Sequence, residues 1–178
     1  TGHGANNVFS HENVLLLNDF STMSSRHLPL WVTASCDIAP FDASSECIGV
    51  NALLNPKGGA LALLTTTRTV YSSLNMKINV LFDNYALRQE NTLGDAARLA
   101  KVQLVTPSSS IQDFSENKLH YVLLGDPALH LDVPQSRIVI DSIATDALQD
   151  GMPIAQAGGR MTLTGYVAGA DGRPDEGF

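Results

Sequence analysis

The apolar run "LPLWVTAS" at residues 28–35 constrains the fold more than any other part of the chain. It is rich in β-branched and large apolar side chains and is followed by the polar pair Cys36 and Asp37. A strand that is apolar on both faces is typical of a parallel sheet covered by helices on both sides. Residues 59–67 and 118–127 contain two similar runs. We therefore expect an α/β protein with these strands in its middle layer.

Helical patterns occupy the stretches between these strands. Apolar residues recur at helical spacing within residues 40–59, in a segment that starts near Ser72, and in a segment that starts at Thr92 and ends before Pro107. The order strand, helix, strand, helix, helix, strand predicts a doubly wound α/β domain with a mostly parallel sheet. Ligands of such folds bind beyond the carboxyl ends of the strands.

The pattern changes after Pro134. "RIVIDSIAT" and "GRMTLTGYVAG" alternate apolar and polar residues and are separated by turn residues, which indicates antiparallel strands. We place a domain boundary near residue 134 and expect residues 135–178 to begin a small β-sandwich. So short a segment supplies only a few strands, and exposed strand edges favour self-association with another chain.

Charge and composition exclude several classes of function. The chain has 178 residues, 44% of them hydrophobic, and a net charge of −7. Nucleic acids and anionic membranes require a basic face, so neither is an expected partner. No apolar run is long enough for a transmembrane helix. The two cysteines, Cys36 and Cys47, form neither a disulfide scaffold nor a metal-binding motif, so we expect no metal and no cofactor.

His3 and Cys36 are the candidate catalytic pair. Cys36 directly follows the strand at residues 28–35, and His3 lies between Gly2 and Gly4. A thiol nucleophile needs a base such as imidazole, and it needs backbone N–H groups directed at the oxyanion. A glycine after the histidine lets the backbone approach a substrate. From the residues alone, catalysis and a structural coincidence both remain open, because any α/β protein can carry His and Cys at strand ends.

The other polar candidates have structural interpretations. His11 and His27 are expected in solvated positions, and Asp37 either orients the site or ends its strand. The remaining interpretations are a structural role for His120 and His130, a turn at Asp126, a helix cap at Asp42 or Ser44, and a core position for Cys47.

Four segments together resemble the gingipain-like cysteine peptidases: "TGHGANNVF", "LPLWVTASCDIAPFD", "GGALALLTTTRTVY" and "YVLLGDPALHL". Their order and spacing match the family over residues 1 to about 131, with 33 positions from His3 to Cys36. The resemblance implies the C-terminal half of a caspase-like three-layer α/β/α peptidase domain in residues 1–134. It also implies the start of an immunoglobulin-like domain in residues 135–178. "VIDSI" followed by "LTG" is most similar to the type IX secretion sortase branch.

The resemblance also implies roles for individual residues. Cys36 would be the nucleophile and His3 the general base and acid. The N–H groups of Gly4 and Cys36 would form the oxyanion hole. The primary specificity pocket would be lined by Thr1, Ala34, Thr67 and Tyr71. The third catalytic acid and the charged base of the pocket lie upstream of the histidine in this family. We therefore expect a fragment that starts at the catalytic histidine and is weak or inactive alone.

The implied function is that of a cysteine endopeptidase or sortase-type transpeptidase. Its substrates would be exported proteins with a C-terminal sorting domain, and other secretion-system surface proteins would be its partners. The implied location is the outer face of the outer membrane of a Gram-negative bacterium. The alternatives are a non-catalytic binding or assembly module that keeps the fold, and an unrelated Cys–His hydrolase.

Overall fold

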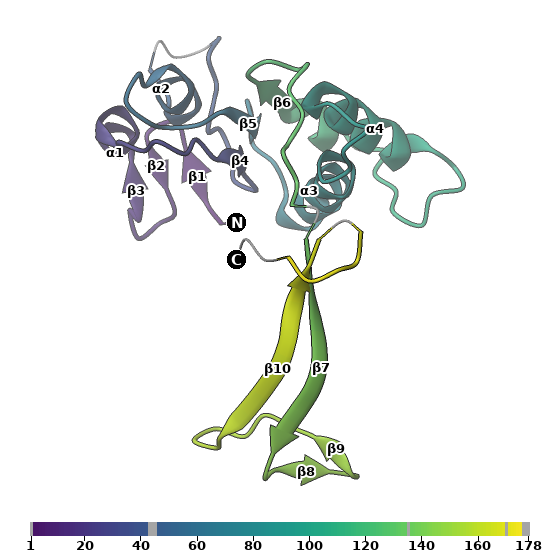
Figure 1. Cartoon of the computed structure of the whole chain (residues 1–178). Coiled ribbons are helices and arrows are strands. Elements are labelled where there is room, and N and C mark those ends of the chain that lie inside the picture. The colour runs from purple at the N-terminus through teal and green to yellow at the C-terminus, as the bar shows by residue number, and fades with distance from the viewer. Residues whose placement is uncertain (1, 43–45, 135, 170, 176–178) are drawn as a thin grey trace. The chain divides into compact units, whose positions relative to one another are not determined.

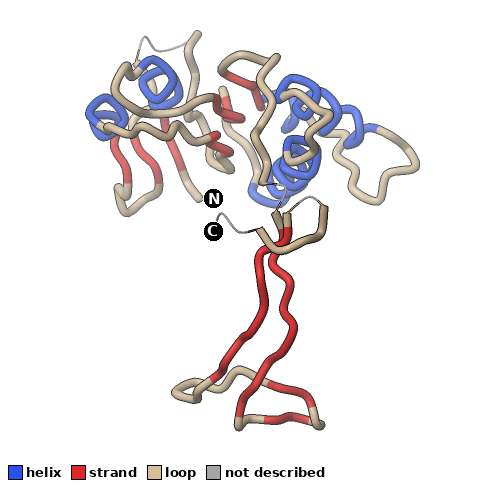
Figure 2. The backbone as a smooth tube through the Cα atoms, viewed as in Figure 1, coloured by secondary structure: helices blue, strands red, loops and turns tan. Residues whose placement is uncertain are grey.

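The structure is a computed structural model that describes residues 2–42, 46–134, 136–169 and 171–175. The chain divides into two compact units, Thr1–Asp132 and Val133–Phe178, which are described separately. Unit 1 contains all the helices among the described residues, and unit 2 is built from β-strands and turns (Figures 1 and 2). The expected division at residue 134 lies two residues from this boundary.

The central sheet of unit 1 has the order β4-β5-β6, formed by Leu30–Val32, Ala62–Thr66 and Tyr121–Leu124. β4 and β5 are parallel, as the sequence predicts. β6 is antiparallel to β5, with Thr66 opposite Tyr121, so the described part of the sheet is mixed. All five residues of β5 are buried, which agrees with its continuous apolar sequence.

The direction of β6 follows from the number of helices that precede it. A single helix after β5 would return the chain to the start of that strand and give a parallel neighbour. Here α3 (Ser72–Ala86) is followed by α4 (Leu93–Val105), which packs against it, and then by the 3₁₀ helix η1 (Asn117–His120). The second helix brings the chain back to the end of β5, where β6 begins. Both predicted helix starts, near Ser72 and at Thr92, are confirmed.

Helices cover both faces of the sheet, as expected for a three-layer α/β/α arrangement (Figure 1). On one face, Ala62 and Leu64 of β5 pack with residues of α3 and α4, including Ile78, Phe82 and Ala100. On the other face, Leu63 packs with residues of α1 (Leu17–Thr22) and α2 (Ile48–Leu54), including Phe20, Ile48 and Ala52. Side chains of successive strand residues point to opposite faces, so β5 contributes to both clusters.

The start of α2 differs from the expectation. The helix begins at Ile48, with Cys47 at the N-cap and fully buried, so the core position of Cys47 is confirmed. The expected cap by Asp42 is wrong, because this carboxylate binds the Arg68 guanidinium instead, with an N–O distance of 2.5 Å. The alternative cap, Ser44, lies outside the described residues.

A small antiparallel sheet follows His3. Its strands are β1 (Gly4–Ala5), β2 (Val8–Phe9) and β3 (Leu15–Leu16). Phe9 of β2 packs against the rings of Phe20 and Trp31, with ring centroids 5.7 and 6.3 Å away. This aromatic contact holds the small sheet against β4 and α1.

Unit 2 is a long antiparallel ribbon of β7 (Arg137–Thr145) and β10 (Met161–Ala168), with a short hairpin of β8 (Leu148–Gln149) and β9 (Met152–Pro153). The two strands expected after Pro134 are confirmed. The register places Ile143 opposite Leu163, and both side chains are exposed. A two-stranded ribbon cannot bury such a face by itself.

Candidate active site

Cys36 lies in a turn four residues after the end of β4. The next residue, Asp37, has a φ of 51°, a left-handed conformation that non-glycine residues adopt rarely. Its N–H donates to the Arg68 carbonyl, and its carboxylate accepts from the Thr69 hydroxyl. The Ala39 N–H donates to the carbonyl of Thr66 at the end of β5. The turn is therefore fixed to the carboxyl end of the neighbouring strand, the position at which α/β proteins bind their ligands.

The segment around His3 packs directly against this turn. The Gly2 N–H donates to the Ala34 carbonyl over 3.2 Å. A Cβ on Gly4 would lie 2.8 Å from the Ser35 Cβ and 3.1 Å from the Cys36 carbonyl oxygen, so only glycine fits at this position. The tertiary structure thus brings the backbones of the two predicted catalytic segments into contact.

The thiol of Cys36 has its hydrogen-bond partners on the opposite side, in the loop after β5. Sγ lies 3.3 Å from the Val70 carbonyl oxygen and 3.4 Å from the Val70 nitrogen. His3 is exposed and Cys36 is half-buried, and no hydrogen bond joins the His3 ring to Sγ among the residues that the structure describes. The roles of His3 and Cys36, and of the Gly4 and Cys36 N–H groups as an oxyanion hole, stay predictions.

Ala34 lies between two cavities. One has a volume of about 300 Å³ and is lined by His3, Phe9, Trp31 and Ser35 among others. The other, of about 310 Å³, is lined by Ala34, Ser72, Met76, Asn79, Val80 and Asp83. Burial raises the pKa of the Asp83 carboxyl in this second cavity. The face of α3 is thus a wall beside Ala34, and no local sequence pattern indicates it.

The other residues expected in the specificity pocket occupy different surroundings. Thr67, the first residue after β5, donates its N–H and its hydroxyl to the carbonyl of His120 in η1. The Tyr71 side chain is largely exposed, and its N–H donates to the Asn117 side chain. Thr1 lies outside the described residues. The pocket assignment for these residues stays a prediction.

Tyr121 is a further residue near the thiol that the sequence did not reveal. Its ring is almost fully buried in the cluster beneath α3 and α4, and its hydroxyl has no hydrogen-bond partner of normal geometry among the described residues. Burial is the main cause that raises the pKa of this hydroxyl, and the nearby charge of the Cys36 thiolate raises it further. Only the antiparallel pairing of β6 with β5 places Tyr121 here, so no local sequence signal could have indicated it.

A model of peptidase family C25 matches residues 1–132, the whole of unit 1. The chain belongs to peptidase family C25. This is the gingipain family of cysteine peptidases, so the resemblance seen in the sequence is confirmed at the level of the family.

Solved structures of gingipains share the fold of this C25 chain. The crystal structure of the Arg-specific cysteine proteinase gingipain R has a TM-score of 0.56 at 17% identity and covers 79% of this chain and 35% of its own. The complex of Porphyromonas gingivalis RgpB pro- and mature domains has a TM-score of 0.60 at 17% identity, and the match covers 79% of this chain and 36% of the RgpB chain. A third structure, described as "Structure of Protease", has a TM-score of 0.58 at 15% identity, and the match covers 97% of this chain and 45% of the other. The C25 chain thus spans less than half the length of these structures. No match was found among curated proteins.

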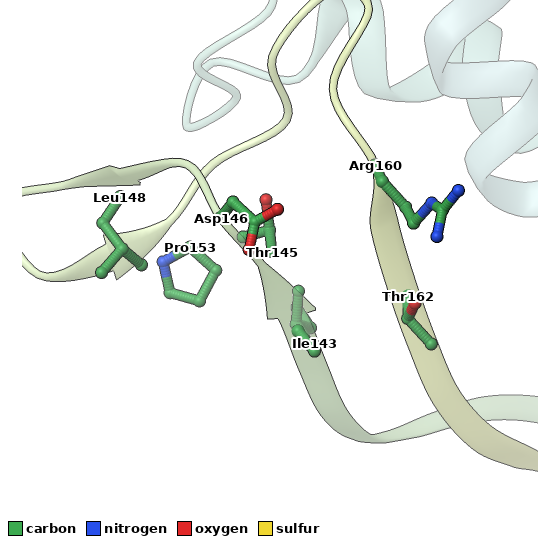
Figure 3. Close-up of a pocket in the computed structure, with 8 residues that line it drawn as sticks. Ile143, Thr145, Asp146, Leu148, Pro153, Arg160 and Thr162 are labelled. Carbon is green, nitrogen blue, oxygen red and sulfur yellow. The ribbon is translucent and has the colours of Figure 1, made fainter.

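Unit 2 of the C25 chain has a hollow of its own. It has a volume of about 340 Å³ and is lined by Asp146 and Arg160 together with threonine and apolar side chains, and its lining contains neither cysteine nor histidine (Figure 3). Within the described ranges, no group of three or more His, Cys, Asp or Glu side chains could hold a metal ion. No helix of the described residues is long and apolar enough to cross a bilayer.

Proposed function

We propose that this chain contributes the nucleophile and the general base of a cysteine peptidase, with Cys36 and His3 in these roles. The observation that carries the proposal is the close packing of Gly4 against Ser35 and Cys36, which leaves no room for a Cβ. It brings His3 and Cys36 to one edge of the sheet, in a family of cysteine peptidases.

The reaction follows from the chemistry of the pair. The Cys36 thiolate attacks a peptide carbonyl carbon, and the N–H groups of Gly4 and Cys36 receive the developing oxyanion. The C–N bond breaks as imidazolium His3 donates its proton to the leaving amine. The resulting thioester is then cleaved by water or by an amine, and His3 accepts the proton of the attacking group.

The choice between water and an amine decides whether the reaction is hydrolysis or transpeptidation. We propose the amine, which makes the protein a sortase-type transpeptidase. It would remove C-terminal sorting domains from type IX secreted proteins and transfer the new carboxyl end to a surface anchor. The corresponding location is the outer face of the outer membrane. The sequence similarity of residues 139–143 and of the "LTG" strand to the sortase branch supports this proposal.

Unit 2 belongs to this proposal as the start of an immunoglobulin-like domain that follows the peptidase domain. Its strands β7 and β10 leave the apolar side chains Ile138, Ile140 and Leu163 exposed. In a β-sandwich, a second sheet would cover such an apolar face.

A non-catalytic binding module is the second candidate. The observation that favours it is the contact of Sγ with Val70 instead of the His3 ring. Labelling with a peptide chloromethyl ketone separates the two candidates, because this reagent requires an activated cysteine. We expect labelling at Cys36 that is lost in Cys36→Ala and strongly reduced in His3→Ala. The exposed His27 provides the control His27→Ala, which should label normally. Labelling that persists in Cys36→Ala excludes Cys36 as the nucleophile.

A further inference from the structure

Two peptide groups enclose the sulfur of Cys36, and both include Val70. The Val70 N–H, in the peptide group of Thr69 and Val70, donates to Sγ over 3.4 Å. The Val70 carbonyl, in the next peptide group, accepts from the thiol over 3.3 Å. A thiol can use both contacts, but a thiolate has no proton to donate. The N–H contact is therefore the one that favours the ionised form.

His120 binds the other end of the donating peptide group. Its Nδ1 lies 2.9 Å from the Thr69 carbonyl oxygen, and since a carbonyl only accepts, Nδ1 carries the proton. The C=O and N–H of a trans peptide point in opposite directions, and the described residues contain no cis peptide bond. A continuous chain of hydrogen bonds therefore runs from the His120 ring, through the Thr69–Val70 peptide group, to the sulfur of Cys36.

Asn117 holds the second peptide group in a comparable way. Its side-chain oxygen accepts from the Tyr71 N–H over 2.8 Å, and this N–H belongs to the same peptide group as the Val70 carbonyl. Asn117 is buried, and its amide donates to the Asn75 side chain. Each of the two peptide groups at the sulfur is thus fixed by one side chain of η1.

We propose that His120 is a positioning residue that stabilises the Cys36 thiolate through the Thr69–Val70 peptide group. Its hydrogen bond orients the Val70 N–H toward the sulfur and polarises it, because hydrogen bonds in a chain strengthen one another. His120 itself touches neither the sulfur nor a substrate. The other titratable and charged side chains at this loop and at the thiol are Asp37, which binds Thr69, Arg68, which is paired with Asp42, and the buried Tyr121.

This proposal gives a function to the loop after β5. The loop is fixed at its start by the bonds from Thr67 to the His120 carbonyl. His120 therefore contacts the loop with both its backbone and its side chain. The inference rests on the proposed function only in taking Cys36 as the nucleophile, and it can be tested without a substrate.

The test measures alkylation of Cys36 by iodoacetamide as a function of pH, because only the thiolate reacts. Cleavage before Asp37 and Asp42 separates Cys36 from Cys47 for mass spectrometry. In His120→Ala we expect alkylation about three- to tenfold slower than wild type at pH 7, with the midpoint of the profile at higher pH, as for a lost donor to a thiolate. The plateau at high pH should be unchanged.

Two variants separate positioning from a general structural effect. His120→Asn keeps a side-chain N–H donor and should restore part of the lost rate. His130 makes the same kind of contact, with Nδ1 3.2 Å from the Gln89 carbonyl oxygen, and Gln89 is not part of the loop after β5, so His130→Ala should leave the profile unchanged.

The outcomes that overturn the proposal are distinct. An unchanged midpoint in His120→Ala, or an equal shift in His130→Ala, excludes a role for His120 at the sulfur. A changed plateau with the same midpoint indicates an opened loop and also overturns it. Failure of the proposed function would instead appear as normal iodoacetamide profiles without any labelling by the peptide chloromethyl ketone.

Discussion

A Cβ on Gly4 would lie 2.8 Å from the Cβ of Ser35, closer than side-chain atoms approach one another in folded proteins. This contact fixes the segment that carries His3 against the turn that carries Cys36. The backbone of one predicted catalytic segment packs against the other at this position. This packing accounts for the glycine after the histidine more directly than a need for substrate access does.

Gly4→Ala should therefore destabilise unit 1 and displace His3. We expect a loss of about 1–3 kcal/mol in the free energy of unfolding, as for overpacking at other close contacts. Urea unfolding provides the measurement. Gly169→Ala is the matched control, since its Cβ would meet its nearest neighbour at 3.5 Å. Equal stability of the two variants would contradict the packing argument.

Thr92 should contribute measurably to the stability of α4. Its hydroxyl accepts from the Asp95 N–H over 3.0 Å and satisfies one of the free N–H groups at the helix start. Thr92→Ala should lower the free energy of unfolding by about 1 kcal/mol. Thr106→Ala at the other end of α4 is the control, because the Thr106 hydroxyl only donates to the Val102 carbonyl and should cost less. A larger loss in the control would exclude this role of the cap.

Asp83 and Asp95 should have opposite effects on stability as the pH changes. Burial raises the pKa of Asp83 above 3.8, so its ionised form opposes folding at neutral pH. Asp83→Asn should stabilise the protein at pH 7, and this gain should shrink as the pH falls through the raised pKa. The effect will be small, because Asp83 is largely exposed and solvent screens its charge.

For Asp95, the hydrogen bonds from Arg98 and Thr92 lower the pKa, so the ionised form supports folding above pH 3.8. Asp95→Asn should destabilise the protein at pH 7, and the difference should disappear as the pH falls through the lowered pKa. Urea unfolding of both variants at pH 7, 5 and 3.5 tests the pair. Differences that stay constant with pH would show that neither carboxyl couples its ionisation to folding.

The apolar face of the unit 2 ribbon should promote self-association of the chain. Ile143 and Leu163 face each other across β7 and β10 and are 44% and 57% exposed. Exposed apolar patches of this kind favour contacts between molecules. Sedimentation should show more monomer in Ile143→Thr and Leu163→Thr than in wild type. Thr164→Ser on the opposite face should not change the distribution.

Much of the architecture could be predicted from local sequence patterns. Residues 28–35 and 59–67 contain β4 and β5, and the helix starts at Ser72 and Thr92 agree with the structure. These features depend on periodicity and on residues within one turn of a helix, so a single segment contains the necessary information. The turn expected at Asp126 is confirmed as well, because its carboxylate accepts from the Ala128 N–H.

The candidate site could be predicted only in part. His3 and Cys36 are visible as motifs, whereas His120 has no local feature that distinguishes it from His130. Asp42 was misassigned because its partner Arg68 lies 26 residues away. The antiparallel direction of β6 also could not be read locally, since it depends on two helices packing as a pair.

The sequence alone determined the strands β4 and β5, the starts of α3 and α4 and the family of this protein, because each of these is written in contiguous segments, and it predicts the Cys–His pair. Only the tertiary structure decided what surrounds the sulfur of Cys36. The Val70 peptide groups contact it from the loop after β5, the His120 ring of η1 contacts that loop at the Thr69 carbonyl, and Tyr121 of β6 lies nearby. Backbone groups are the same in every residue, so their position against a side chain follows from the packing of distant elements and from no local pattern.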